Sequence, residues 1–210
     1  MMDERSRMKK RCGVVGSAFG AGFWAGAVTL LVMIAAGIWI AMQPARYFDI
    51  QLTDTGVGVM GTATFTGFTS EFLNGGRFNM IEFGRDMLTA DAMGYPKQVF
   101  LVGYFGWIPC VAAFVGVLGA LRYIFRNIKR YDTPFTTQNI KALYILGIII
   151  IAGLYMYRTV LPLVCWTMGF GTGDFTILDF YSFFPGTPFF CLAYIFDYGC
   201  VLQKESDETL

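Results

Sequence analysis

The residues of this chain best placed to do chemistry are a few charges beside its long apolar segments. Ionisable groups at membrane depth are costly, and they mark ion or proton pathways in many membrane proteins. Four charged residues have this position: Arg158, Asp174, Asp179 and Asp197. A proton relay and structural ion pairs both fit them, and we favour ion pairs. We expect Arg158 to pair with one of the next two aspartates, and Asp197 to meet Arg122 or Arg126.

Most catalytic and metal-binding constellations lack their residues in this sequence. The chain has no histidine, which removes Ser–His and Cys–His nucleophile pairs and zinc sites that use histidine. No carboxylate pair and no Ser–Lys pair stands in the middle of an apolar segment, as acid–base or nucleophilic catalysis would need. The five cysteines show no C-x-x-C spacing and are expected to act as small buried hydrophobic residues: Cys12, Cys110, Cys165, Cys191 and Cys200. We therefore predict a protein without catalytic residues, metal or cofactor.

The composition is typical of a membrane protein. Of 210 residues, 55% are hydrophobic and 15% charged, whereas a soluble domain has about 25% charged residues. The net charge of +1 gives no electrostatic indication of nucleic-acid binding. A helix needs about 20 apolar residues to cross a bilayer, and the uncharged runs predict four such helices, over 14–42, 98–121, 141–164 and 183–202. The predicted fold class is an all-α membrane protein, with 1–210 as a single membrane domain.

The distribution of lysine and arginine predicts the orientation. Segments 1–11 and 122–141 and the tail 203–210 contain eleven of these cations together, whereas 43–97 and 159–187 contain four. Positive charge accumulates in short cytoplasmic segments, so we expect both termini in the cytoplasm. The first apolar run is longer than the 7–15 residues of a signal peptide and is expected to remain as a helix.

The extracytoplasmic segment 43–97, between the first two helices, has 55 residues and is too long for a simple connection. Partial alternation over 53–68 predicts a short hairpin, and 72–88 could form an amphipathic helix lying against the membrane. A ligand-sensing role and a passive cap over the helices both fit this segment. We favour the cap.

Small residues and prolines indicate how the helices pack. Glycine and alanine recur at four-residue spacing in 16–26 and in 112–120. Such stripes let helix backbones approach closely in lipid, so we expect these two stripes to form the tightest contact, within the monomer or between protomers. The alternative is that glycine is simply frequent in membrane helices. Pro109 and Pro162 lie inside predicted helices and should kink them.

The cytoplasmic loop 122–140 begins with a basic continuation of the second helix. A turn is expected at 132–134, followed by Thr136 as the N-cap of the third helix. The fourth helix starts either at an N-cap on Thr187 or earlier, near Asp179, with a break at its prolines.

Two stretches resemble a known family. Residues 132–143, DTPFTTQNIKAL, are similar to its motif G-x-P-F-T-x-E-N-x-x-x-L, with Gln138 in place of the acidic residue. Residues 196–210, FDYGCVLQKESDETL, are similar to its closing motif F-x-x-G-x-x-L-Q-x-E-x-D-x-T-(L/V). On these motifs the chain resembles the bacterial membrane proteins called domain of unknown function 2975. The resemblance implies a four-helix inner-membrane protein, often encoded beside a small helix-turn-helix regulator, and it supplies no biochemical activity.

The function that we predict is a non-enzymatic regulatory or partner-docking role at the cytoplasmic face of the bacterial cytoplasmic (inner) membrane. The candidate docking residues come from the loop and the tail: Asp132, Pro134, Phe135, Thr136, Asn139, Gln203, Glu205, Asp207 and Glu208. The candidate charges at membrane depth are Arg158, Asp179 and Asp197. The partners considered are the lipid bilayer, the helix-turn-helix regulator and further copies of the chain, without direct nucleic-acid binding. The alternative is a small transporter or channel subunit acting as an oligomer.

Overall fold

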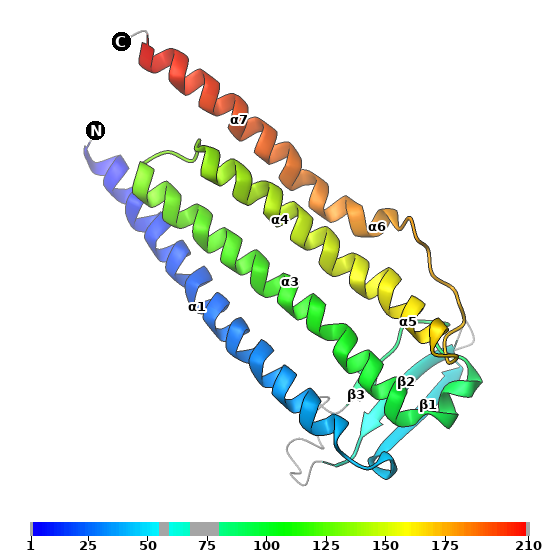
Figure 1. Cartoon of the computed structure of the whole chain (residues 1–210). Coiled ribbons are helices and arrows are strands. Elements are labelled where there is room, and N and C mark those ends of the chain that lie inside the picture. Colours follow the sequence, from blue (N-terminus) through cyan, green and yellow to red (C-terminus); the bar gives the residue numbers. More distant parts are fainter. Residues whose placement is uncertain (1, 55–58, 68–79, 209–210) are drawn as a thin grey trace. The chain divides into compact units, whose positions relative to one another are not determined.

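The computed structural model describes residues 2–54, 59–67 and 80–208, and helices dominate it (Figure 1). The chain divides into two compact units, each built from separated segments. The bundle unit comprises Met1–Leu30, Val111–Leu154 and Phe180–Leu210. The sheet unit comprises Leu31–Cys110 and Tyr155–Asp179.

Three long helical stretches correspond to the first three predicted spans. They are α1 (Met2–Ala41), α3 (Pro96–Tyr131) and α4 (Thr137–Tyr155), which continues through a π-helical turn η4 (Met156–Val160) into α5 (Leu161–Thr167). Within the described residues, three stretches are long and apolar enough to cross a bilayer: Lys10–Ala41, Pro96–Tyr131 and Thr137–Thr167. Helices of this kind are characteristic of membrane proteins.

The last helical segment begins earlier than its threonine signal indicates. It consists of α6 (Phe180–Phe183), a 3-10 turn η5 (Phe184–Gly186) and α7 (Thr187–Glu208). The prediction of an N-cap on Thr187 is wrong, because its backbone is helical and its hydroxyl donates to the Phe183 carbonyl at 3.1 Å. The start near Asp179 is the correct alternative. α7 is not among the three membrane-spanning candidates, so the count of four crossings stays a prediction.

The two prolines lie in different local structures, and the kinks expected at them stay predictions. Pro162 lies two residues after the π-helical turn η4, in the first turn of α5. Proline lacks the N–H that would continue the helical ladder, and a π turn is one way to accommodate this loss. Pro109, in contrast, lies inside the continuous helix α3.

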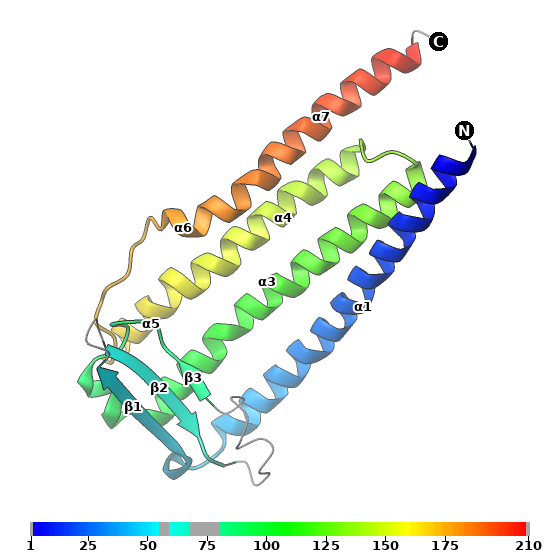
Figure 2. The ribbon, with the colours of Figure 1, turned by 180° about the vertical axis from the view of Figure 1, so that it is seen from behind.

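In the bundle unit the helices lie side by side in the order α1, α3, α4, α7, as the opposite views in Figures 1 and 2 show. The glycine stripe of α1 does face α3: a Cβ added to Gly26 would lie 2.8 Å from Val115. The partner stripe was assigned wrongly, because Gly116 faces Ile149 of α4 instead, at 3.2 Å. Four-residue spacing shows which small residues share one face of a helix, but it does not show which of two neighbouring helices that face contacts.

A close backbone approach in this unit involves α4 and the segment just before α7. A Cβ on Gly186 would lie 2.6 Å from the Gly147 carbonyl oxygen. Tyr144 and Phe190 stack at 5.9 Å between centroids one helical turn along. Small residues that allow such an approach are typical of helix contacts in lipid.

The sheet unit contains a three-stranded antiparallel sheet in the order β1 (Phe48–Asp54), β2 (Val59–Phe65) and β3 (Met80–Glu82). A hairpin is present as predicted, but it begins at Phe48 and not at Thr53, with Phe48 opposite Phe65 and Asp54 opposite Val59. The all-α fold class is wrong in this respect, because the alternating segment forms a sheet with a hydrophobic face.

The face of the sheet shares one core with α3. Phe48, Phe65 and Phe100 form an aromatic cluster with centroids 5.0–6.0 Å apart, and all three are buried. A Cβ on Gly103 would lie 2.6 Å from both Ile81 and Phe83, so β3 and the residues after it press directly on the helix.

The amphipathic helix predicted over 72–88 is not found in its described part. Residues 80–88 contain β3 followed by a turn, and residues 72–79 lie outside the described residues. Strand β3 forms here because its backbone pairs with β2, where Ala63 lies opposite Ile81.

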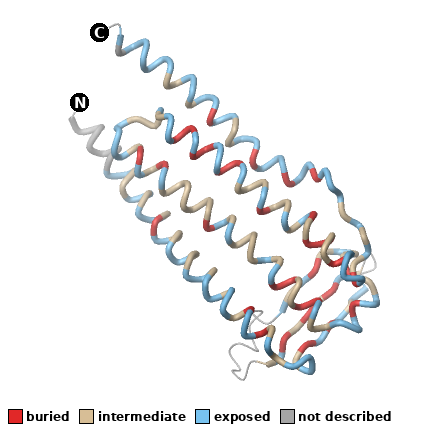
Figure 3. Tube along the Cα trace, in the orientation of Figure 1, coloured by how far each residue is buried: buried red, intermediate tan, exposed pale blue. Residues whose placement is uncertain are grey.

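Many large apolar side chains remain exposed on the helices of the bundle unit. Figure 3 shows that exposed residues recur along α1 and α7. Trp24 on α1 is 62% exposed and Tyr194 on α7 is 72% exposed. Soluble monomers rarely expose large contiguous apolar patches. Such surfaces suit a hydrocarbon environment.

Candidate functional site

The first family motif begins at Asp132, directly after α3 ends at Tyr131. Asp132 has a positive φ of 57°, and its N–H donates to the Ile128 carbonyl at 3.0 Å. Aspartate tolerates this left-handed conformation better than most residues. The Thr133 hydroxyl then accepts a hydrogen bond from the Phe135 N–H at 3.2 Å, which closes the turn. The predicted turn at 132–134 is confirmed.

A buried polar network joins this turn to the first turn of α4. The Asn139 N–H donates to the Thr136 hydroxyl at 3.2 Å, which confirms the predicted N-cap. The Asn139 side chain is fully buried, donates to the Pro134 carbonyl at 2.8 Å and accepts from the Asn127 amide at 3.2 Å. Asn139 therefore holds the loop in shape from a buried position, and half-buried Pro134 contributes its carbonyl to the same network.

The second family motif lies on one face of α7 and contacts the first motif directly. Phe196, Gly199 and Gln203 are spaced by three and four residues, which places them on one side of a helix. The Phe135 ring packs edge to face on Phe196 at 5.5 Å and lies over Gly199, where a Cβ would be only 2.4 Å away. The Thr133 hydroxyl donates to the Gln203 side-chain oxygen at 3.1 Å.

A polar groove of about 520 Å³ opens beside this contact, between the loop and α7. The α3–α4 side contributes Tyr131, Thr133, Phe135, Thr136, Thr137 and Gln138. The α7 side contributes Asp197, Cys200, Val201, Gln203 and Lys204. The groove therefore combines hydroxyl and amide groups with one carboxylate and one ammonium group, an arrangement suited to hydrogen bonding with a polypeptide surface.

The structure brings only part of the predicted docking set into this groove. Phe135, Thr136 and Gln203 line it, whereas Asp132, Glu205 and Glu208 are exposed but lie outside it. The helix α7 includes position 207, but the Asp207 side chain lies outside the described part of the structure.

Sequence reasoning missed Cys200 and Lys204 as groove residues and gave Asp197 a different role. Asp197, Cys200 and Lys204 are spaced by three and four residues, so helical periodicity through the second motif would have placed them on one face. Asp197 was expected to meet Arg122 or Arg126, and that expectation is wrong. Among the described residues, Asp197 forms no ion pair with either arginine and lines the groove beside Lys204.

The charges near the end of α4 belong to the sheet unit and form the predicted ion pair. Arg158, in the π-helical turn, pairs through its Nε with Asp179, and the two side chains are 47% and 8% exposed. The choice between the two aspartates is thus settled in favour of Asp179. A paired arginine of this kind orders the end of the helix.

The described residues contain no group of three histidine, cysteine, aspartate or glutamate side chains that could hold a metal ion. None of the five cysteines, all of which are described, forms a disulfide.

Comparison with known proteins gives a family match that includes both motifs of this contact. A family model described as "Protein of unknown function (DUF2975)" matches residues 80–210, which is more than half of the chain. No curated protein and no solved structure matches this chain. The matched region contains α3, α4 and α7 and the groove between the α3–α4 loop and α7. The chain therefore belongs to this family, Protein of unknown function (DUF2975).

Proposed function

We propose that the protein crosses the bacterial cytoplasmic membrane four times, with both termini in the cytoplasm, and docks a soluble regulatory protein in the groove between the α3–α4 loop and α7. The role is regulatory and non-enzymatic. The observation that carries the proposal is the convergence of the two family motifs on one open polar groove.

The packing of α7 against α4 supports a fourth crossing. Gly186 lies against Gly147, and Gly199 lies against Phe135 just before α4 begins, so α7 follows α4 over this length. The segment from Phe180 to Gly199 has 20 residues, which corresponds to about 30 Å of helix, close to the thickness of the hydrocarbon core. Exposed aromatic side chains along this segment are suited to contact with lipid.

The positive charges support a cytoplasmic position for the groove. The loop and the preceding turns of α3 are rich in lysine and arginine, as is the N-terminal segment. Positive charge of this kind is retained in the cytoplasm. A partner in the cytoplasm could then reach the groove without crossing the membrane.

The charge of the tail indicates what kind of partner surface would bind there. Residues 203–210 carry one lysine and three carboxylates, at Glu205, Asp207 and Glu208. An acidic tail beside a polar groove suits a partner with a basic surface. The DNA-reading helix of a helix-turn-helix regulator has such a surface, and the family resemblance implies that a gene of this class often stands beside the gene of the membrane protein. Docking there would compete with DNA binding by the regulator.

Co-purification tests the proposal. The full chain, tagged at its N-terminus, is co-expressed with a helix-turn-helix regulator encoded beside its gene, extracted in mild detergent and captured. Thr137→Trp places a large ring in the groove and should reduce the captured regulator about tenfold, which corresponds to about 1.4 kcal/mol. Deletion of 205–210 should reduce it as well, through loss of the carboxylates.

The matched control is Lys141→Trp, four residues further along α4 at an exposed position outside the groove. This variant should capture the regulator like the wild-type chain. Undiminished capture by both Thr137→Trp and the tail deletion would exclude the groove as the docking surface.

A further inference from the structure

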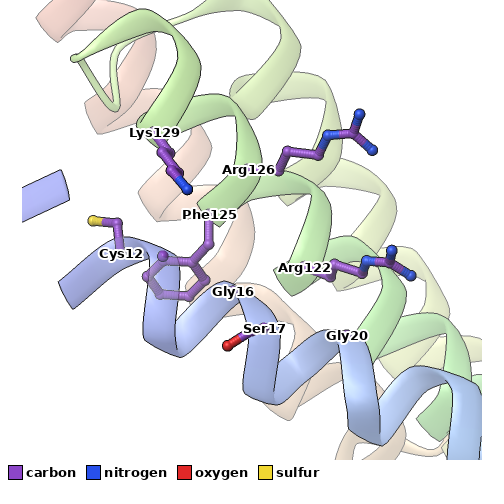
Figure 4. Close-up of a pocket in the computed structure, with 9 residues that line it drawn as sticks. Cys12, Gly16, Ser17, Gly20, Arg122, Phe125, Arg126 and Lys129 are labelled. Atoms are coloured by element: carbon purple, nitrogen blue, oxygen red, sulfur yellow. The ribbon is translucent and has the colours of Figure 1, made fainter. Parts of the chain in front are cut away.

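A second groove, of about 330 Å³, lies between α1 and α3 in the bundle unit (Figure 4). Three cations line it from one side of α3: Arg122, Arg126 and Lys129. The facing turns of α1 present Gly13, Gly16 and Gly20, which have no side chains to fill the space. Arg122 and Lys129 reach over α1, and their side-chain atoms would lie 3.3 Å and 3.5 Å from a Cβ on the facing glycines.

The stretches of α1 and α3 that line this groove contain no carboxylate. The sequence contains no aspartate or glutamate between Glu4 and Asp49, and none between Asp91 and Asp132. Among the described residues, none of the three cations has an ion-pair partner within 4.0 Å. Arginines four residues apart on one helix repel each other, so an anion from outside the chain would stabilise this arrangement.

The surroundings of Arg122 indicate what carries this anion. Its guanidinium carbon lies 5.8 Å from the Phe23 ring centroid and 5.9 Å from that of Trp24. Trp24 and Val28 continue along α1 as apolar side chains that are 62% and 59% exposed. A charged headgroup in the groove would therefore have an apolar surface beside it along which an acyl chain can lie.

We propose that this groove is a binding site for the phosphate of an anionic phospholipid headgroup. Basic pockets between membrane helices at the cytoplasmic side are suited to such headgroups, and arginine binds phosphate oxygens through its planar fork of donors. The cluster of Arg122, Arg126 and Lys129 supplies the charge, the glycines of α1 supply the room, and Phe125 lies between them over Gly16. The bound lipid would join α1 to α3 at this end of the bundle.

Native mass spectrometry of the full chain in detergent, titrated with phosphatidylglycerol, tests the site without reference to orientation or to any protein partner. The wild-type chain should retain one phosphatidylglycerol more tightly than phosphatidylcholine. The double variant Arg126→Gln/Lys129→Gln removes two exposed cations that line the groove and should weaken the apparent affinity about 25-fold. That figure follows from about fivefold for each cation, the equivalent of about 1 kcal/mol.

The matched control is Arg130→Gln/Lys141→Gln, which changes the net charge equally at two exposed positions outside the groove. Its affinity for phosphatidylglycerol should equal that of the wild-type chain. Equal weakening by both double variants would overturn the site. Displacement of the lipid by inorganic phosphate at the same concentration would overturn its assignment to a phospholipid, and equal retention of phosphatidylcholine would overturn its dependence on net negative charge.

Discussion

Replacement of Gly199 by alanine probes the contact between the two family motifs. The added Cβ would lie 2.4 Å from Cδ1 and 2.6 Å from Cε1 of Phe135. Carbon atoms in contact prefer a separation of about 3.5–4.0 Å, so the Phe135 ring must move by about 1 Å or more. That movement disturbs its edge-to-face packing on Phe196 and strains the turn that Thr133 closes.

The expected size of the effect follows from two opposing terms. Overpacking of a well-packed contact costs about 1–3 kcal/mol. Alanine in place of glycine inside a helix returns about 1 kcal/mol. We therefore expect Gly199→Ala to lower the free energy of unfolding by up to about 2 kcal/mol.

Reversible unfolding in mixed detergent micelles, followed by helical circular dichroism, measures this change. Gly22→Ala on α1 is the matched control, because its new Cβ would meet only Leu118 at an ordinary 3.5 Å. It should leave the stability unchanged or raise it. In a Phe135→Ala background the obstacle is gone, so Gly199→Ala should then stabilise the protein by about 1 kcal/mol.

The reasoning would be refuted if Gly199→Ala were at least as stable as the wild-type chain. An equal effect of the substitution with and without the Phe135 ring would refute it as well, because the clash would then not be its cause.

Two further substitutions test the polar contacts of each unit. Asn139→Leu leaves the buried Asn127 amide without its acceptor and should lower the free energy of unfolding by about 1–3 kcal/mol. The control Gln138→Leu, at an exposed position, should have little effect. Similar losses of stability for both variants would argue against the network. Asp179→Asn removes the ion pair of Arg158, and because that arginine is 47% exposed we expect a loss of about 1–2 kcal/mol, between the values for exposed and buried pairs. Thermal unfolding at low and high salt measures it, and an unchanged midpoint at both would contradict a stabilising pair.

Local rules were enough to predict much of the α3–α4 loop. The N-cap at Thr136 and the turn before it depend on backbone geometry within a few residues, so residue type alone identifies them. The same rules failed at Thr187, because the preceding residues are already helical and the hydroxyl bonds back to Phe183 instead of capping. A cap signal is reliable only where the chain before it is not helical.

Contacts between distant segments could not be read from spacing. Gly116 stands on a stripe that could face either neighbour, and the packing against Ile149 decided for α4. From the sequence we expected Asp197 to pair with Arg122 or Arg126 at the basic end of the second predicted helix. In the structure Asp197 lines the groove together with Lys204. The burial of Asn139 also depends on Asn127, which belongs to another helix.

The sequence by itself determined where long apolar helices form, the family, and the local turn and cap between the second and third of them. These properties follow from composition, charge and hydrogen bonds between near neighbours, which act within a few residues of each position. The tertiary structure decided that the two family motifs touch, that Phe135 covers Gly199, and that one groove is lined mostly by polar residues. It also placed three cations along a second groove, where they have no ion-pair partner among the described residues. Those outcomes depend on which helix faces are brought together, and side-chain volumes and backbone distances between remote segments set that choice.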